Sequence, residues 1–129
     1  MIVLDEHFPE SQRQLLRGWR MRFRRIGHET GRSGMKDYEI VPFLHQLHHP
    51  TFFTLDFWFN KRELCHARYC LVYLNVNQYE AAEFIRRFLR RREFTKEADR
   101  LGSVVHVSPI GIAVWRLHAS LQERISWSV

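Results

Sequence analysis

The strongest constraint on the fold is the alternation of short apolar runs with segments of helical periodicity. Apolar runs of strand length occupy residues 2–4, 51–56 and 69–74, and two further strands are expected at 103–107 and 110–115. Helices are expected between them at residues 9–17, 37–48 and 78–92. Strands and helices that alternate in this way favour an α/β fold, a three-layer α/β/α sandwich on a mainly parallel sheet. We therefore expect strands 1–5, 51–56 and 69–74 to be adjacent and parallel.

The clearest helix is the segment 78–92, which has one apolar and one basic side. Its apolar residues recur at helical spacing, and they are Ala81, Phe84, Ile85, Phe88 and Leu89. The opposite side carries Arg86, Arg87, Arg90 and Arg91. Asn77, followed three residues later by Glu80, resembles a capping box at the start of this helix.

Two segments are less regular. Trp19, Met21 and Phe23 alternate with arginines, and this period of two predicts a strand over 19–24, near a sheet edge because one side is charged. In the helix 37–48, Pro42 removes a backbone donor and crowds the preceding turn. That helix is therefore expected to be kinked or to start later than residue 37.

The length and composition fit one domain. The 129 residues span a single domain of common size, and an apolar share of 45% can form a core. No apolar run approaches the roughly 20 residues of a membrane helix. The N-terminus lacks the basic and apolar regions of a signal peptide, and two cysteines make no disulfide framework. These features indicate a cytoplasmic, reduced protein that does not insert into a membrane.

The basic charge indicates a polyanionic partner. The net charge is +6, and of the 20 basic residues only Lys36, Lys61 and Lys96 are lysine. Arginine grips phosphate through two parallel hydrogen bonds, so an arginine-rich surface suits RNA. A GC-rich coding sequence explains the same excess equally well. Arg86, Arg87, Arg90 and Arg91 are accordingly interpreted as an RNA-binding face or a contact for an acidic protein segment, with a solvated helix face as the alternative.

Three of the four aspartates occupy positions typical of an active site. Asp5 and Asp56 each end an apolar strand, and Asp37 begins a helix. Sites in open parallel sheets form beyond the carboxyl ends of the strands, where these residues would converge. Converging carboxylates repel one another unless a cation neutralises them, and Mg²⁺ or Mn²⁺ prefers such oxygen ligands. Taken singly, the same aspartates are explained equally well as turn and helix caps.

Short motifs around these aspartates resemble the short, divergent branch of the PIN-like domains. The first strand reads Leu4-Asp5-Glu6 and then Pro9, the helix begins Asp37-Tyr38-Glu39-Ile40, and a later strand ends Thr54-Leu55-Asp56. The resemblance carries motifs over residues 1 to about 60, and continues to about 116 only in the order of elements. It implies a PIN fold and Mg²⁺- or Mn²⁺-dependent RNA cleavage with Asp5, Asp37 and Asp56 as ligands. In many relatives the protein is the VapC-like toxin of a toxin–antitoxin pair, which implies a cognate antitoxin as partner.

The chain departs from that branch at Trp58. Relatives commonly carry a further aspartate there, so the expected ligand set is incomplete unless Glu6 or Glu39 supplies the missing charge. The aromatic run 57–59 suits base stacking, a covering loop or a contact between two copies of the chain.

Two other classes compete with a ribonuclease. One is a PIN-like module that binds RNA or protein after losing its chemistry, in keeping with Trp58. The other is a phosphoacceptor receiver domain, which shares an acidic pair after the first strand and an aspartate after the third. Receivers also need a lysine after their last strand, and no lysine follows Lys96.

Overall fold

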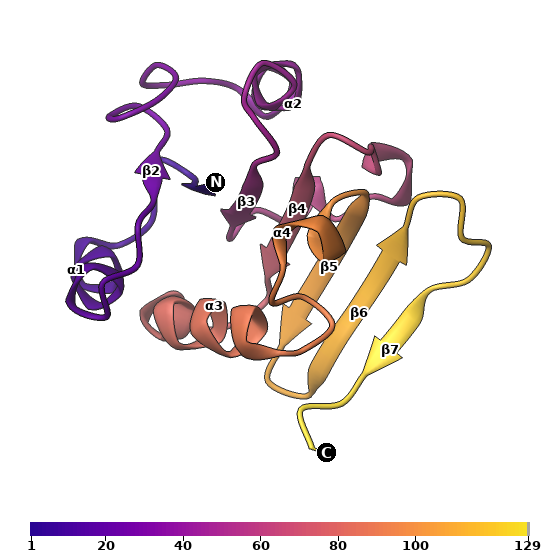
Figure 1. Ribbon diagram of the computed structural model, residues 1–129. Helices are drawn as coiled ribbons and strands as arrows, with labels where there is room; N and C mark the ends of the chain where they lie inside the picture. Colours follow the sequence, from indigo (N-terminus) through magenta and orange to yellow (C-terminus); the bar gives the residue numbers. More distant parts are fainter. Residues whose placement is uncertain (129) are drawn as a thin grey trace.

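The computed structural model describes residues 1–128 as an α/β fold with one mixed sheet (Figure 1). The strands are β1 (Ile2–Leu4), β2 (Arg24–Arg25), β3 (Thr51–Thr54), β4 (Cys70–Leu74), β5 (Ser103–Ser108), β6 (Gly111–Arg116) and β7 (Glu123–Ile125). The helices are α1 (Glu10–Gly18), α2 (Asp37–Leu44), α3 (Ala81–Arg90) and α4 (Glu97–Arg100), with 3-10 turns η1 (Phe57–Phe59), η2 (Arg62–Leu64) and η3 (Gln78–Glu80).

The sheet has seven strands in the order β2-β1-β3-β4-β5-β6-β7. The first five strands are parallel, and β6 and β7 add an antiparallel extension. The prediction that the first, third and fourth strands lie side by side and parallel is confirmed, with Leu4 opposite Phe53 and Phe53 opposite Val72. Because parallel strands end at the same edge, the residues that follow β1 and β3 meet there.

Apolar residues on both faces of the central strands account for helices on both sides of the sheet. Leu4 and Phe53 pack in one core cluster with α1 and α3, and their neighbours Val3 and Phe52 pack in a second cluster with α2. Successive strand residues point to opposite faces, so the two clusters lie on opposite sides. Figure 1 shows α1 and α3 together, well apart from α2.

One connection runs against the usual hand. From β1 the chain passes through α1 to β2, towards one edge of the sheet. From β4 it passes through α3 to β5, towards the opposite edge. Their helices nevertheless cover the same face, where α1 and α3 contact each other. Two crossovers that step in opposite directions on one face have opposite hands, whereas parallel connections are almost always right-handed. Gln12 of α1 reinforces the contact, since its side-chain oxygen accepts a hydrogen bond from the Ala82 backbone N–H at 2.9 Å.

The prediction of a strand over 19–24 is wrong for most of its length. Only Arg24–Arg25 pairs, as β2, and it does lie at the sheet edge as expected. Arg20 has a φ of +62°, which is incompatible with an extended strand. Trp19, Met21 and Phe23 are still partly buried against the core. The alternation in this segment therefore reports burial and not strand pairing.

The other boundaries differ by short distances. The second helix begins at Asp37 and contains Pro42, but it ends at Leu44 in place of residue 48. The third helix is preceded by η3, where the Asn77 side chain accepts a hydrogen bond from the Tyr79 backbone at 2.8 Å. The final strands appear where predicted, whereas β7 was not predicted because Glu123, Arg124 and Ile125 form no apolar run. Within residues 1–128, none of the helices has the length and apolarity that a membrane span requires.

Candidate functional site

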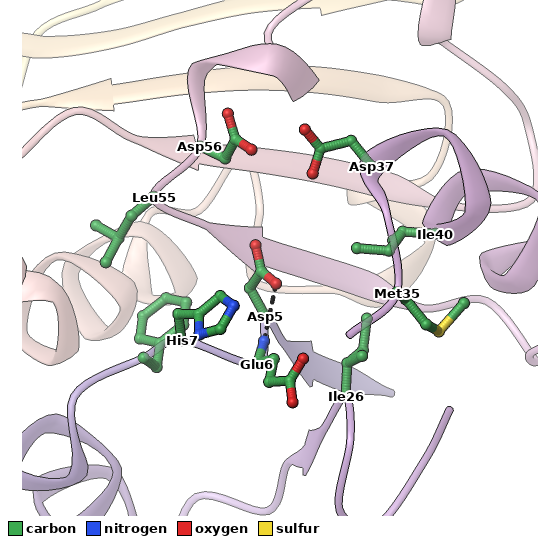
Figure 2. A pocket seen from close by; sticks show the side chains of 10 residues that line it. Asp5, Glu6, His7, Ile26, Met35, Asp37, Ile40, Leu55 and Asp56 are labelled. Carbon is green, nitrogen blue, oxygen red and sulfur yellow. Dashed lines mark hydrogen bonds between the residues drawn. The ribbon is translucent and has the colours of Figure 1, made fainter. Parts of the chain in front are cut away.

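A cavity of about 410 Å³ lies at the carboxyl ends of β1 and β3, beside the start of α2 (Figure 2). It brings together the three aspartates named from the sequence. The residues that line it are Asp5, Glu6, His7, Phe8, Ile26, Met35, Asp37, Ile40, Leu55 and Asp56. The connection that follows β1 and the connection that follows β3 lead to opposite edges and faces of the sheet. Open α/β sheets bind ligands at such a point.

Thr54 links the two strand-end aspartates. Its buried hydroxyl donates a hydrogen bond to Asp5 Oδ2 at 2.6 Å and accepts one from the Asp56 backbone N–H at 3.0 Å. The other Asp5 oxygen accepts a hydrogen bond from the Glu6 backbone N–H at 2.8 Å. Burial raises the pKa of Asp5, and the bond from Thr54 offsets part of that rise. The threonine of the β3 motif thus fixes the orientation of Asp5.

Asp37 and Asp56 face each other across the mouth of the cavity. Figure 2 shows their carboxylates pointing toward one another, with Asp5 pointing toward both from below. Burial, a hydrogen bond to Asp56 and the negative charges of Asp56 and Asp5 raise the pKa of Asp37 to about 6. Asp56 is anchored through Oδ1, which accepts a hydrogen bond from the Trp58 backbone N–H at 2.9 Å. The carboxylates therefore form a site in which negative charge is costly.

Glu6 lines the cavity but is occupied with the neighbouring loop. Its carboxylate accepts hydrogen bonds from the Ser33 hydroxyl and, at 2.8 Å, from the Gly34 backbone N–H. These two bonds lower the pKa of Glu6 and keep it ionised. Glu6 thus holds the loop before α2 against β1, and it adds negative charge at the cavity wall.

Glu39 does not line the cavity. Its carboxylate accepts a hydrogen bond from the Lys36 backbone N–H at 3.0 Å and pairs with Arg32. The bond to Lys36 is the largest cause of a lowered pKa for Glu39. Glu39 therefore caps the start of α2, and through that cap it orients Asp37 two residues earlier.

Three arginines of α3 and the following Arg91 lie away from its apolar face, and none of them lines the cavity. Arg86 stacks on the Trp19 ring at 3.8 Å and pairs with Glu83, and Arg87 lies 4.3 Å from the centre of the Trp127 ring. Arg91 pairs with Glu93, and Arg90 is exposed. Aromatic rings from distant segments thus occupy part of the predicted basic face.

Two basic residues near the aspartates were assigned no role from the sequence. His7 lines the cavity, and its charge lowers the pKa of Asp5. Lys61 lowers the pKa of Asp37, and its ammonium lies 3.9 Å from the centre of the Trp58 ring. The position of His7 two residues after a strand-end aspartate was a usable signal. Nothing local marks Lys61, because its approach depends on the fold of η1.

The donor set suits a hard cation without forming a complete cage. Across residues 1–128, no three His, Cys, Asp or Glu side chains are arranged closely enough to hold a metal ion by themselves. Mg²⁺ commonly uses one or two carboxylates and keeps several waters, so a facing pair such as Asp37 and Asp56 matches its chemistry. Burial is the largest cause of the raised pKa of Asp37, and the negative charges of Asp56 and Asp5 add a repulsion that a cation would relieve.

In the metal-free protein, the contribution of Asp37 to stability is expected to fall as the pH rises from about 4 to about 6. The pKa of Asp37 rises from 3.8 to about 6 on folding, so folding favours the neutral acid. That stabilising contribution is complete below the unfolded pKa and disappears as the pH passes the folded one. Asp37→Asn should abolish this part of the pH dependence. Thermal unfolding in excess chelator would measure both proteins, and parallel curves would contradict the expectation.

No protein-family model, no curated protein and no solved structure matches the chain.

Proposed function

We propose that the protein is a PIN-like, divalent-metal-dependent endoribonuclease. The observation that carries the proposal is the facing pair Asp37 and Asp56, with Asp5 in the same cavity at the point where the sheet connections diverge. The motifs around these residues and their order along the chain support the PIN-like assignment.

Asp37 and Asp56, with Asp5 beside them, are the residues that would hold a Mg²⁺ or Mn²⁺ ion. When bound, such an ion supplies positive charge for phosphate oxygens and lowers the pKa of a water molecule. The chain itself orients Asp5 through Thr54 and holds Asp56 through the Trp58 backbone. Glu39 fixes the start of α2. Lys61 brings positive charge near Asp37, where the phosphodiester would bind, and the His7 ring lines the same cavity.

The choice of RNA rests on the motif resemblance and on the basic surface. A net charge of +6 favours a polyanionic substrate through counterion release. Arg90, exposed on α3, and its neighbours Arg86, Arg87 and Arg91 are the proposed contact for RNA flanking the site or for an acidic segment of an antitoxin. Such a partner would make the protein the toxin of a toxin–antitoxin pair.

The strand order favours the alternative of a receiver domain. Doubly wound sheets of that class have the same order, β2-β1-β3-β4-β5. In a regular sheet of that kind, right-handed connections would put α3 on the face that α2 covers. Here α3 covers the face of α1. The chain also has no lysine after Lys96. These differences argue against a receiver domain.

The proposal is tested with purified protein and single-stranded RNA. Cleavage is expected with Mg²⁺ or Mn²⁺, none in excess chelator, and recovery when Mn²⁺ is added back. Equal cleavage in chelator would contradict a metal-dependent reaction. Binding without cleavage under every metal would instead identify a module that has lost its chemistry.

A further inference from the structure

One row of side chains crosses four neighbouring strands next to the aspartate cavity. The strand register places Tyr73 of β4 opposite His106 of β5, His106 opposite Ala113 of β6, and Ala113 opposite Arg124 of β7. Tyr73 alternates with Val72 and Leu74, which pack with α1 and α3. The row therefore faces away from those helices, on the side of the sheet that α2 covers farther along.

This row is open to solvent. Tyr73, His106 and Ala113 are partly exposed, and Arg124 is exposed. Beyond Tyr73, a cavity of about 360 Å³ is lined by His106 and Arg124 together with residues of the β5–β6 turn. The sheet surface here is a shallow trough and not a part of the packed core.

Aromatic rings connect the trough to the aspartate cavity. Phe57 directly follows Asp56, and 65% of its side chain is exposed. Its ring meets the ring of Tyr73 edge to face with 5.5 Å between centres, and the rings of Tyr73 and His106 are 5.3 Å apart. Phe57, Tyr73 and His106 thus form a continuous aromatic path that begins beside a proposed metal ligand and ends near Arg124.

The chemistry of this path favours unpaired nucleotides. Base faces stack on aromatic side chains, and a nearby arginine contacts the backbone, as in proteins that bind single strands. Burial and the charge of Arg124 lower the pKa of His106, so its ring is neutral at pH 7. Bases paired in a duplex have no free faces to offer.

We propose that the path Phe57–Tyr73–His106–Arg124 binds the unpaired bases and backbone of single-stranded RNA next to the scissile phosphate. The inference rests on the proposed function and specifies its substrate class. Phe57 stacks the nucleotide nearest the carboxylates, Tyr73 and His106 carry the bases that follow, and Arg124 contacts a phosphate.

The test is equilibrium binding of a short, labelled single-stranded RNA to the full-length protein in chelator, where cleavage does not interfere. Phe57→Ala and His106→Ala are each expected to weaken binding about 5-fold or more, which is the effect of losing one base–aromatic stack. His106→Phe keeps an aromatic face and should bind like the parent. Arg124→Gln should weaken binding and reduce its dependence on salt.

Tyr79→Ala is the matched control. Its side chain is 63% exposed, nearly as much as that of Phe57, but it lies in η3, which contacts α1 and α3. It should leave RNA binding unchanged. The same strand annealed to its complement should bind the parent more weakly than the single strand.

The outcomes separate this inference from the proposed function. Loss of binding in Phe57→Ala with no cleavage by the parent under any metal would support the path and reject the nuclease. Normal cleavage by the parent, with equal RNA binding in all path variants, would reject the path and retain the nuclease. Stronger binding of the duplex than of the single strand would also reject the path. So would concentration-dependent self-association that Phe57→Ala abolishes, and that result would assign the trough to a second copy of the chain.

Discussion

Replacing Asp5 or Asp56 by asparagine is expected to lower metal-dependent RNA cleavage by about 100-fold or more. Asparagine keeps the shape of the side chain and an oxygen that accepts the bond from Thr54 or from the Trp58 backbone. It removes one negative charge from the proposed ligand set. Single-turnover cleavage at saturating Mn²⁺, with circular dichroism to verify the fold, would measure the loss. Full activity of Asp5→Asn would contradict the assignment of that residue.

Glu39→Gln provides the matched carboxylate control for that experiment. Glu39 lies on α2 close to Asp37 in sequence, but it caps the helix and does not line the cavity. Its amide variant should retain most of the cleavage activity and lose only a little stability, because glutamine can still accept the capping hydrogen bond. A loss of activity as large as that of Asp5→Asn would make Glu39 a member of the ligand set.

Phe53→Ala is expected to lower the free energy of unfolding by about 3–5 kcal/mol, the usual cost of deleting a buried phenyl ring. Phe53 is fully buried in β3, and its ring contacts that of Phe88 in α3 with 5.8 Å between centres. The deletion removes the contact that joins the central strand to the helix. Urea denaturation would measure the change, provided that the transition remains two-state.

The control for Phe53→Ala lies four residues along the chain. Phe57 carries the same side chain, but 65% of it is exposed, so Phe57→Ala should change stability by less than about 0.5 kcal/mol. Comparable losses for the two variants would show that the burial of Phe53 is not what stabilises β3. The same comparison establishes that the binding tests with Phe57→Ala are made on a folded protein.

The parts of the site that could be predicted follow from the geometry of parallel strands. Asp5 and Asp56 end apolar runs, and parallel neighbours bring such ends together whatever else the chain does. The role of Thr54 could not be predicted, because its hydroxyl reaches Asp5 across 49 residues of sequence. The same holds for Lys61, whose position depends on the 3-10 turn before it.

Helical periodicity alone could not show what covers part of the arginine face of α3. Trp19 and Trp127, from distant segments, pack against Arg86 and Arg87. Residues 19–23 alternate in burial for the same reason, since Trp19 fills a space beside α3 without pairing as a strand. Local periodicity reports which side of a segment is covered, and tertiary packing decides what covers it.

The connection from β4 through α3 to β5 has a consequence for the order in which the chain folds. Strand twist favours right-handed connections, and this connection has the opposite hand. Local geometry therefore does little to favour the pairing of β5 with β4. The helix is instead held by α1, where Gln12 meets Ala82 across 70 residues of sequence. Contacts between segments so distant carry a large loop-closure cost and slow the search for the native topology. We therefore expect α3 and β5 to reach their native places late in folding, after α1 has packed on β1.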